Sequence, residues 1–199
     1  MTRTELLEHL KDFTLEVTKD IILPVAQQKE DKTPPLPRAP EVYKMRLPDS
    51  NAAKKKAPYI IHQVLNGEDI QEPGTFPVGD TVVRTIFAVY HRDEQEGGLA
   101  LLELMERMRI AFLVQQVIGK QFKLNLQAGL ETLAYPDGSA PYFGGEMISV
   151  WRMPPIERKV LYGKEGYSWI KQPGPGRGCD QPCDGRFPGG VVPGPGGKD

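Results

Sequence analysis

The longest proline-free apolar stretch of the chain constrains its fold most strongly. Residues 99–119 are rich in strong helix formers and end at Gly119, which predicts one long helix with that glycine just beyond its last turn. One apolar stripe recurs at helical spacing: Leu101, Leu104, Met105, Met108 and Phe112. A second set is expected to widen it: Leu102, Ile110, Val114 and Val117. A face this wide is typical of a helix that lies across a sheet.

Four segments have the alternation of strands. Residues 58–65 lead into Asn66-Gly67, which predicts a hairpin turn. Residues 79–93 carry β-branched and aromatic side chains on both faces, as a central strand does. Residues 121–135 and 142–153 flank a turn at Pro136-Asp137-Gly138, and we expect them to form a hairpin. The last strand is expected to define a sheet edge.

The two ends of the chain differ from this middle part. Apolar residues at helical spacing predict an amphipathic helix that ends before Pro24; they are Leu6, Leu7, Leu10, Phe13, Val17 and Ile21. Residues 24–57 are rich in proline and lack periodicity, which indicates an extended arm. Residues 171–199 are rich in glycine and proline and have few apolar side chains with which to build a core.

Together these segments predict an α+β domain in which helices pack on a mostly antiparallel four-stranded sheet. We expect residues 1–23 to be a helix that belongs to the core domain, and residues 58–170 to form the rest of that domain. The arm spans residues 24–57, and a Gly/Pro-rich extension spans residues 171–199.

The charge balance excludes a general attraction to nucleic acid or anionic membranes, because 25 basic and 26 acidic side chains leave a net charge of −1. No apolar run has the length of a membrane span, and the first residues lack the apolar stretch of a signal peptide. We therefore expect a cytoplasmic protein with no membrane partner. Cys179 and Cys183 have three residues between them and no second ligand pair, so no metal is expected.

Candidate chemistry is sparse, and no cofactor is expected. His91 precedes Arg92, Asp93 and Glu94, so it is either part of an acid/base cluster or a polar strand end that leads into a loop. The run Lys54, Lys55 and Lys56 is either a solvated cluster or a surface that faces phosphate. Trp151, with Met153, could line a pocket, pack in the core or anchor a partner.

The order of segments resembles a known family. A strand at residues 81–93, a helix led by Gly97-Gly98, a strand from residue 122 and a closing strand resemble the tail terminator (tail completion) proteins of long-tailed bacteriophages. In that family an aromatic and small-residue start, an alternating strand, a tryptophan and a proline exit commonly close the domain. The matching residues here are Tyr142, Phe143, Trp151 and Pro155-Ile156-Glu157. The resemblance covers about residues 58–158.

This resemblance implies a virion structural protein without enzymatic activity, located in the tail or neck, and in the host cytoplasm during assembly. Six copies would form a ring on the tail tube protein, end tail polymerisation and present the surface that joins the head connector proteins. DNA would pass through the lumen. Tyr142, Phe143, Trp151, Pro154 and Pro155 are the expected interface residues. The alternatives are a head-tail connector or adaptor subunit, and a small enzyme centred on His91.

Overall fold

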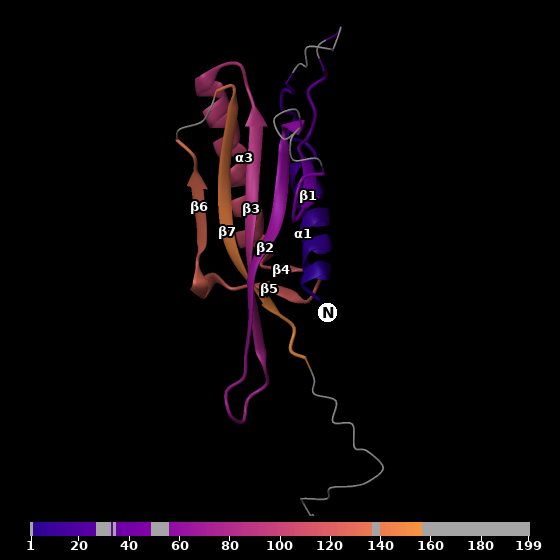
Figure 1. Ribbon diagram of the computed structural model, residues 1–199, viewed down its shortest axis with the longest axis vertical. Helices are drawn as coiled ribbons and strands as arrows, with labels where there is room; N and C mark the ends of the chain where they lie inside the picture. The colour runs from indigo at the N-terminus through magenta and orange to yellow at the C-terminus, as the bar shows by residue number, and fades with distance from the viewer. Residues whose placement is uncertain (1, 27–32, 34, 49–55, 137–139, 157–199) are drawn as a thin grey trace, which may run out of the picture. The chain divides into compact units, whose positions relative to one another are not determined.

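The computed structural model describes residues 2–26, 33, 35–48, 56–136 and 140–156 (Figure 1). They lie in one compact unit, Met1–Arg158. The predicted extension at residues 171–199, with Cys179 and Cys183, lies outside the described residues, as do Lys54 and Lys55. The elements in chain order are α1 (Arg3–Thr18), β1 (Glu41–Lys44), β2 (Tyr59–Ile70), β3 (Val78–Tyr90), α3 (Glu94–Gln115), β4 (Val117–Ile118), β5 (Phe122–Leu124), the 3-10 helix η2 (Leu126–Ala128), β6 (Leu130–Ala134) and β7 (Tyr142–Met153).

The fold is α+β, as predicted, but the expectation of a mostly antiparallel four-stranded sheet is wrong. The sheet has seven strands in the order β1-β2-β3-β7-β5-β4, and β6 also pairs with β7. It is mixed, because β1 runs parallel to β2 while the other pairs are antiparallel. Strand β3 lies inside the sheet, as predicted. Strand β7 is also internal and does not form the expected edge, since β3 lies on one side of it and β5 and β6 on the other.

The extra strands come from segments whose sequence patterns are short. Within the proline-rich segment, residues 41–44 lie between Pro40 and Pro48 and form β1, with Val42 buried. The predicted strand at residues 121–135 divides into β5 and β6, because η2 and Gly129, with a φ of 88°, interrupt it. A left-handed glycine of this kind cannot continue a regular strand. Strand β4 forms from what was expected to be the end of the long helix.

The turn predicted at Asn66-Gly67 is also misplaced. Both residues lie within β2 and pair with β3, next to a bulge between Val64 and Asn66. The chain reverses at residues 71–77, where Gly74 has a φ of 81°. At position 67 a side chain would collide with Arg3, because a Cβ atom would lie 2.1 Å from its Nε atom. This glycine therefore leaves room for the guanidinium group of Arg3 beside β2.

The long helix begins and ends earlier than its sequence pattern suggested. The carboxylate of Asp93 accepts a hydrogen bond from the Glu96 N–H at 2.9 Å and caps the N-terminus of α3. At the other end Gln116, with a φ of 49°, stops the helix before Gly119. The first predicted stripe is buried as expected: Leu101, Leu104, Met105, Met108 and Phe112. The second set, however, is exposed: Leu102, Ile110, Val114 and Val117.

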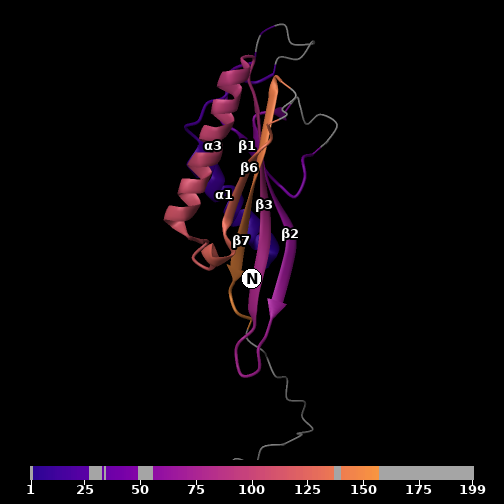
Figure 2. The same cartoon turned by 90° about the vertical axis from the view of Figure 1, so that its left-hand side faces the viewer.

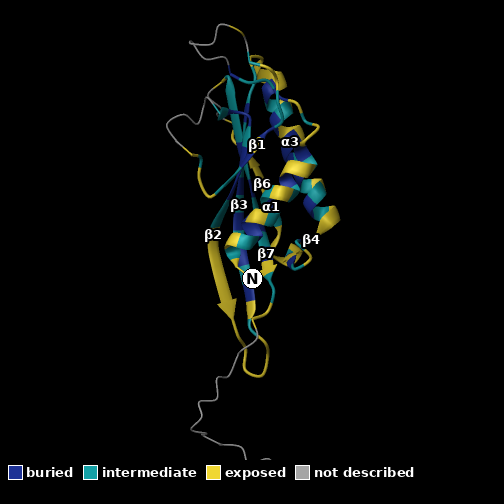
Figure 3. Cartoon of the chain, turned by 90° about the vertical axis from the view of Figure 1, so that its right-hand side faces the viewer, coloured by how far each residue is buried: buried dark blue, intermediate teal, exposed yellow. Residues whose placement is uncertain are grey.

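Both helices pack on the same face of the sheet (Figure 2). Alternate residues of β3 and β7 point toward them and form the core with the buried stripe of α3. Figure 3 shows the buried residues gathered between the helices and the sheet. The core is thus a single layer, and the opposite face of the sheet carries no described helix.

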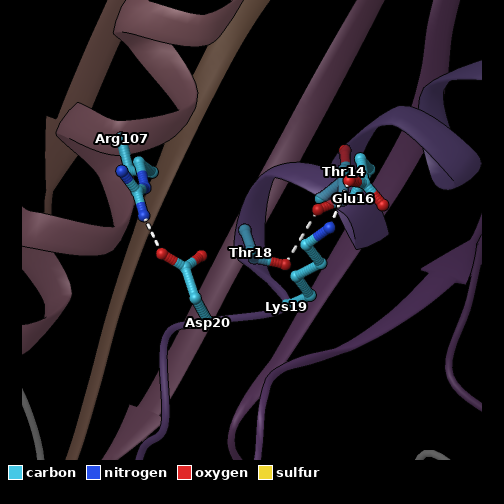
Figure 4. Close-up of polar contacts among 6 residues, drawn as sticks. All are labelled: Thr14, Glu16, Thr18, Lys19, Asp20 and Arg107. Carbon is cyan, nitrogen blue, oxygen red and sulfur yellow. Dashed lines mark hydrogen bonds and ion pairs between the residues drawn. The ribbon is translucent and has the colours of Figure 1, made fainter.

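Polar contacts join α1 to α3 at the C-terminal end of α1 (Figure 4). The carboxylate of Asp20 forms an ion pair with Arg107 of α3. One turn earlier, the Thr18 hydroxyl donates to the Thr14 carbonyl at 2.8 Å. At its N-terminus α1 has a capping box between Thr2 and Glu5. Polar contacts therefore supplement the apolar packing of α1 at both of its ends.

Candidate assembly surfaces

Trp151 belongs to the core and not to a surface, which corrects its expected interface role. Its side chain is fully buried, and its ring meets that of Phe112 edge to face at 5.4 Å. The indole Nε1–H donates to the Ser149 hydroxyl at 2.9 Å, and that hydroxyl donates to the Val83 carbonyl at 3.3 Å. The alternation in the sequence had already grouped Trp151 with Met147 and Ser149, and all three are buried.

Tyr142 and Phe143, two further interface candidates, point to opposite sides of the sheet. Tyr142 is half-buried and lies beside Tyr90, with ring centroids 5.3 Å apart. Phe143 packs against the first turn of α3, where a Cβ atom at Gly97 would lie 2.1 Å from its Cε2 atom. Phe143 therefore packs against the start of α3, while Tyr142 lies on the face without helices.

Pro154 and Pro155 follow β7, as the sequence indicated. Pro155 is exposed, and Pro154 is half-buried in a groove of about 820 Å³. The groove lies between the start of α1, the turn at residues 71–77 and the end of β7, with Arg3, Phe76 and Met153 among its lining residues. Of the predicted interface residues, Pro154 and Pro155 thus lie at one end of the sheet and Tyr142 at the other.

Two exposed apolar surfaces were not predicted. The first is the hairpin tip, which comprises Ile70, Phe76 and Val78; the Phe76 side chain is 76% exposed. It lies at the end of the β2–β3 hairpin, which extends past the neighbouring strands in Figure 1. The second is the outer face of α3, where Leu99, Leu102, Ile110 and Val114 are exposed beside Glu103 and the Glu106–Arg109 ion pair; Val114 is 79% exposed. The sequence indicated that α3 has a wide apolar face. It did not indicate which residues of that face the sheet covers.

The sheet face without helices has a polar cluster at its centre. Arg84 of β3 pairs with Glu146 of β7 and donates to the Tyr135 hydroxyl at 3.2 Å. That hydroxyl donates in turn to Glu146 at 2.8 Å. The hydrogen bond to Tyr135, together with Glu146, raises the pKa of Arg84. Half-buried apolar residues of the same strands surround this cluster: Val82, Ile86, Ile148 and Val150.

The other candidates for chemistry are engaged in local structure. The ammonium group of Lys56 contacts the Pro48 carbonyl, and the Lys56 carbonyl accepts a hydrogen bond from Arg38 at 2.9 Å. The Nδ1 atom of His91 accepts from the Asp93 N–H at 3.1 Å, and Asp93 caps α3. His91 therefore lies at the polar strand end that was one of its two interpretations, and its ring contacts the backbone of the residue that caps α3.

The burial of His62 was not predicted, although alternation in residues 58–65 groups it with Ile60 and Val64; His62 is completely buried between α1 and the sheet. Its Nε2 atom lies 2.8 Å from the Thr14 hydroxyl, and its Nδ1 atom lies 3.0 Å from the Thr85 hydroxyl. Burial lowers the pKa of His62 to about 3, so the ring is neutral at physiological pH. Both ring nitrogens are satisfied, which is typical of a structural and not a catalytic histidine.

Among the described residues, no group of three or more His, Cys, Asp or Glu side chains could hold a metal ion. None of the described helices is long and apolar enough to cross a membrane. No protein-family model matches this sequence, and a search of the curated proteins finds no match.

Proposed function

We propose that this protein is the tail terminator of a long-tailed bacteriophage. Copies of the chain form a six-membered ring that caps the tail tube, ends its polymerisation and joins it to the head connector proteins. The order of elements from residue 58 to residue 156 supports the resemblance on which this rests. The described folded unit is small, and its sites of possible chemistry are engaged in local contacts.

The presence of two different exposed apolar surfaces carries the proposal. The hairpin tip and the outer face of α3 belong to separate elements and consist of different residues. Apolar patches that remain exposed on a small domain commonly mark contacts with other proteins. A ring subunit needs contact surfaces for its neighbours in the ring and a further surface for the structure that it caps. We assign the hairpin tip, at one end of the sheet, to the tail tube.

Electron microscopy of phage that lack this gene tests the proposal. Because the terminator ends polymerisation, the deletion is expected to give overlong tail tubes and heads without tails. The purified protein, added to isolated tail tubes, should bind at one end and stop their growth. Tails of normal length joined to heads in the deletion strain would refute the proposal. Binding to the head's portal assembly and not to tubes would instead identify a connector subunit.

A further inference from the structure

We infer that the ring closes through β1 of one copy and β6 of the next, which pair as antiparallel edge strands. This inference rests on the proposed ring, but not on what the ring caps. Within the described residues, β1 pairs only with β2, and β6 only with β7. Each therefore leaves one side of its backbone without a strand partner. The two edges are on opposite sides of the sheet, at a similar height in Figure 1.

The direction of the unpaired groups can be read from the hydrogen bonds. The N–H group of Glu41 in β1 donates to the carbonyl of Pro58, just before β2, at 3.2 Å, and that of Met45, just after β1, donates to His62 of β2 at 2.7 Å. Because backbone groups alternate along a strand, the N–H groups of Val42 and Lys44 point away from β2. In the same way the Tyr135 N–H donates to Gly144 of β7 at 3.0 Å, so those of Thr132 and Ala134 point away from β7. Both edges thus direct N–H groups outward on alternate residues, and on β1 the outward Lys44 carbonyl already accepts a hydrogen bond from the Arg46 N–H at 2.7 Å.

The strand directions at the two edges also fit an antiparallel pairing. Strand β1 is parallel to β2, while β3, β7 and β6 each reverse direction relative to the strand before them. As a result β6 runs opposite to β1, and a neighbour's β1 placed beside β6 continues the antiparallel order. On both edges the residues with outward N–H groups direct their side chains to the helix-covered face. On β1, Val42 is buried there. On β6, Thr132 pairs with Met147, which is also buried on that face.

One row of residues crosses the sheet from edge to edge, and it gives the register that we infer for this pairing. Tyr43 lies opposite Ile61, which lies opposite Ile86; Ile86 lies opposite Glu146, which lies opposite Leu133. If Tyr43 of one copy pairs with Leu133 of the next, the row continues without a shift along the strands. A head-to-tail contact of this kind gives a closed ring where the rotation from one copy to the next closes, and an open helical assembly where it does not.

The side chains of β6 are suited to pairing, whereas β1 follows Pro40 and carries Glu41 and Lys44. Strand β6 is largely exposed, and Leu133 is 50% exposed on the face without helices. Edge strands that avoid contact usually carry proline, lysine or inward-pointing charges, but β6 has only Glu131 as a charged residue. Tyr43 and Leu133 would form an aromatic and aliphatic cross-strand pair, a favourable combination.

Disulfide cross-linking of the full-length chain tests this contact, with Cys179→Ser and Cys183→Ser as background. Four strand spacings of about 4.8 Å separate β1 from β6 in one copy, roughly 19 Å in all. A disulfide requires Cα atoms within about 7 Å, so a Tyr43→Cys, Leu133→Cys bond must join two copies. The oxidised protein is expected to give a ladder of covalent multimers that ends at the ring size. The control Tyr43→Cys, Thr132→Cys places its thiols on opposite faces and should give no ladder.

A second variant tests the backbone pairing itself. Thr132→Pro removes one outward N–H group, and proline is tolerated on edge strands; Thr132→Val keeps that group. The proline variant should remain folded by circular dichroism but sediment as a monomer, while the valine variant forms rings. Rings that persist in Thr132→Pro, or rings of the Tyr43→Cys, Leu133→Cys variant that form no cross-link on oxidation, would overturn the β1–β6 contact and leave the proposed function intact. Cross-linked rings that fail to cap tail tubes would refute the function and leave the contact standing.

Discussion

The Nε2 atom of His62 lies 2.8 Å from the hydroxyl of Thr14, in the interface between α1 and the sheet. A second hydroxyl, from Thr85, contacts the other ring nitrogen at 3.0 Å. These contacts connect three elements that are distant in sequence through one neutral ring. Because the ring is completely buried, its protonation is unfavourable in the folded state. His62 therefore links the stability of the fold to pH.

We expect the free energy of unfolding to fall as the pH is lowered from about 6.5 toward 3. The unfolded chain binds a proton at the ordinary histidine pKa of 6.5, while burial lowers the folded pKa to about 3. The contribution of a neutral His62 is thus fully present above pH 6.5 and is lost as the pH falls through this interval. Urea denaturation at pH 7.0 and pH 5.0 measures it. The variant His62→Gln should lose most of this slope between those two values, whereas an unchanged slope would contradict the assignment.

Replacing Thr85 by valine should destabilise the fold by about 1–3 kcal/mol, because the Nδ1 atom of His62 then has no partner in a buried site. The substitution keeps the shape of the side chain, so little of the effect comes from a cavity. Thermal and urea denaturation at pH 7 provide the measurement. The matched control is Thr132→Val on exposed β6, where a change below about 0.5 kcal/mol is expected.

Trp151→Ala should reduce the free energy of unfolding by about 3–5 kcal/mol, because it removes the largest side chain of the core and leaves a cavity against Phe112. Pro155→Ala, at an exposed position of the same chain exit, should have little effect on stability. Urea denaturation distinguishes the two. If Trp151→Ala altered ring formation while its unfolding curve matched that of the wild type, Trp151 would be an interface residue and its place in the core would be wrong.

The contrast between α3 and β1 explains how much of the fold the sequence could predict. The buried stripe of α3 and the alternation of β3 and β7 are local patterns that repeat over many residues, so they identify these elements directly. Strand β1 has four residues between prolines, too few for a pattern, and it exists because β2 offers a partner edge. The division of residues 121–135 into β5 and β6 likewise depends on contacts with β7, which no local pattern contains.

The candidate surfaces could be predicted less well than the elements. Trp151 was grouped correctly with Met147 and Ser149 by alternation, but its position near the strand end suggested a rim; β5 and α3 cover that end of β7. The apolar residues of α3 exceed what one sheet can cover, and only the packing of the helix decides which of them are exposed. The hairpin tip was missed because Asn66-Gly67 is a stronger turn signal than the turn that forms at residues 71–77.

The outer face of α3 offers a direct test of an assembly role. Leu102→Ser and Ile110→Ser replace side chains that are 50% and 52% exposed, so the free energy of unfolding of an isolated subunit should change by less than about 0.5 kcal/mol. If this face contacts another subunit, the double variant should weaken the assembly at least tenfold by analytical ultracentrifugation. The control Glu103→Gln changes an exposed polar neighbour and should assemble as the wild type does. Unaltered assembly of the double variant would exclude this face from the ring contacts.

Two adjacent glycines in the first turns of α3 should respond in opposite ways to alanine. At Gly97 a Cβ atom would lie 2.1 Å from Cε2 of Phe143, so the ring must move out of its packed position, at a cost of about 1–3 kcal/mol. At Gly98 a Cβ atom meets nothing within 4 Å, and alanine should stabilise the helix by about 0.5–1 kcal/mol, because glycine loses more conformational freedom on folding. Urea denaturation of the two variants at the same pH gives the comparison. Equal shifts of the same sign would show that Phe143 does not pack against the start of α3.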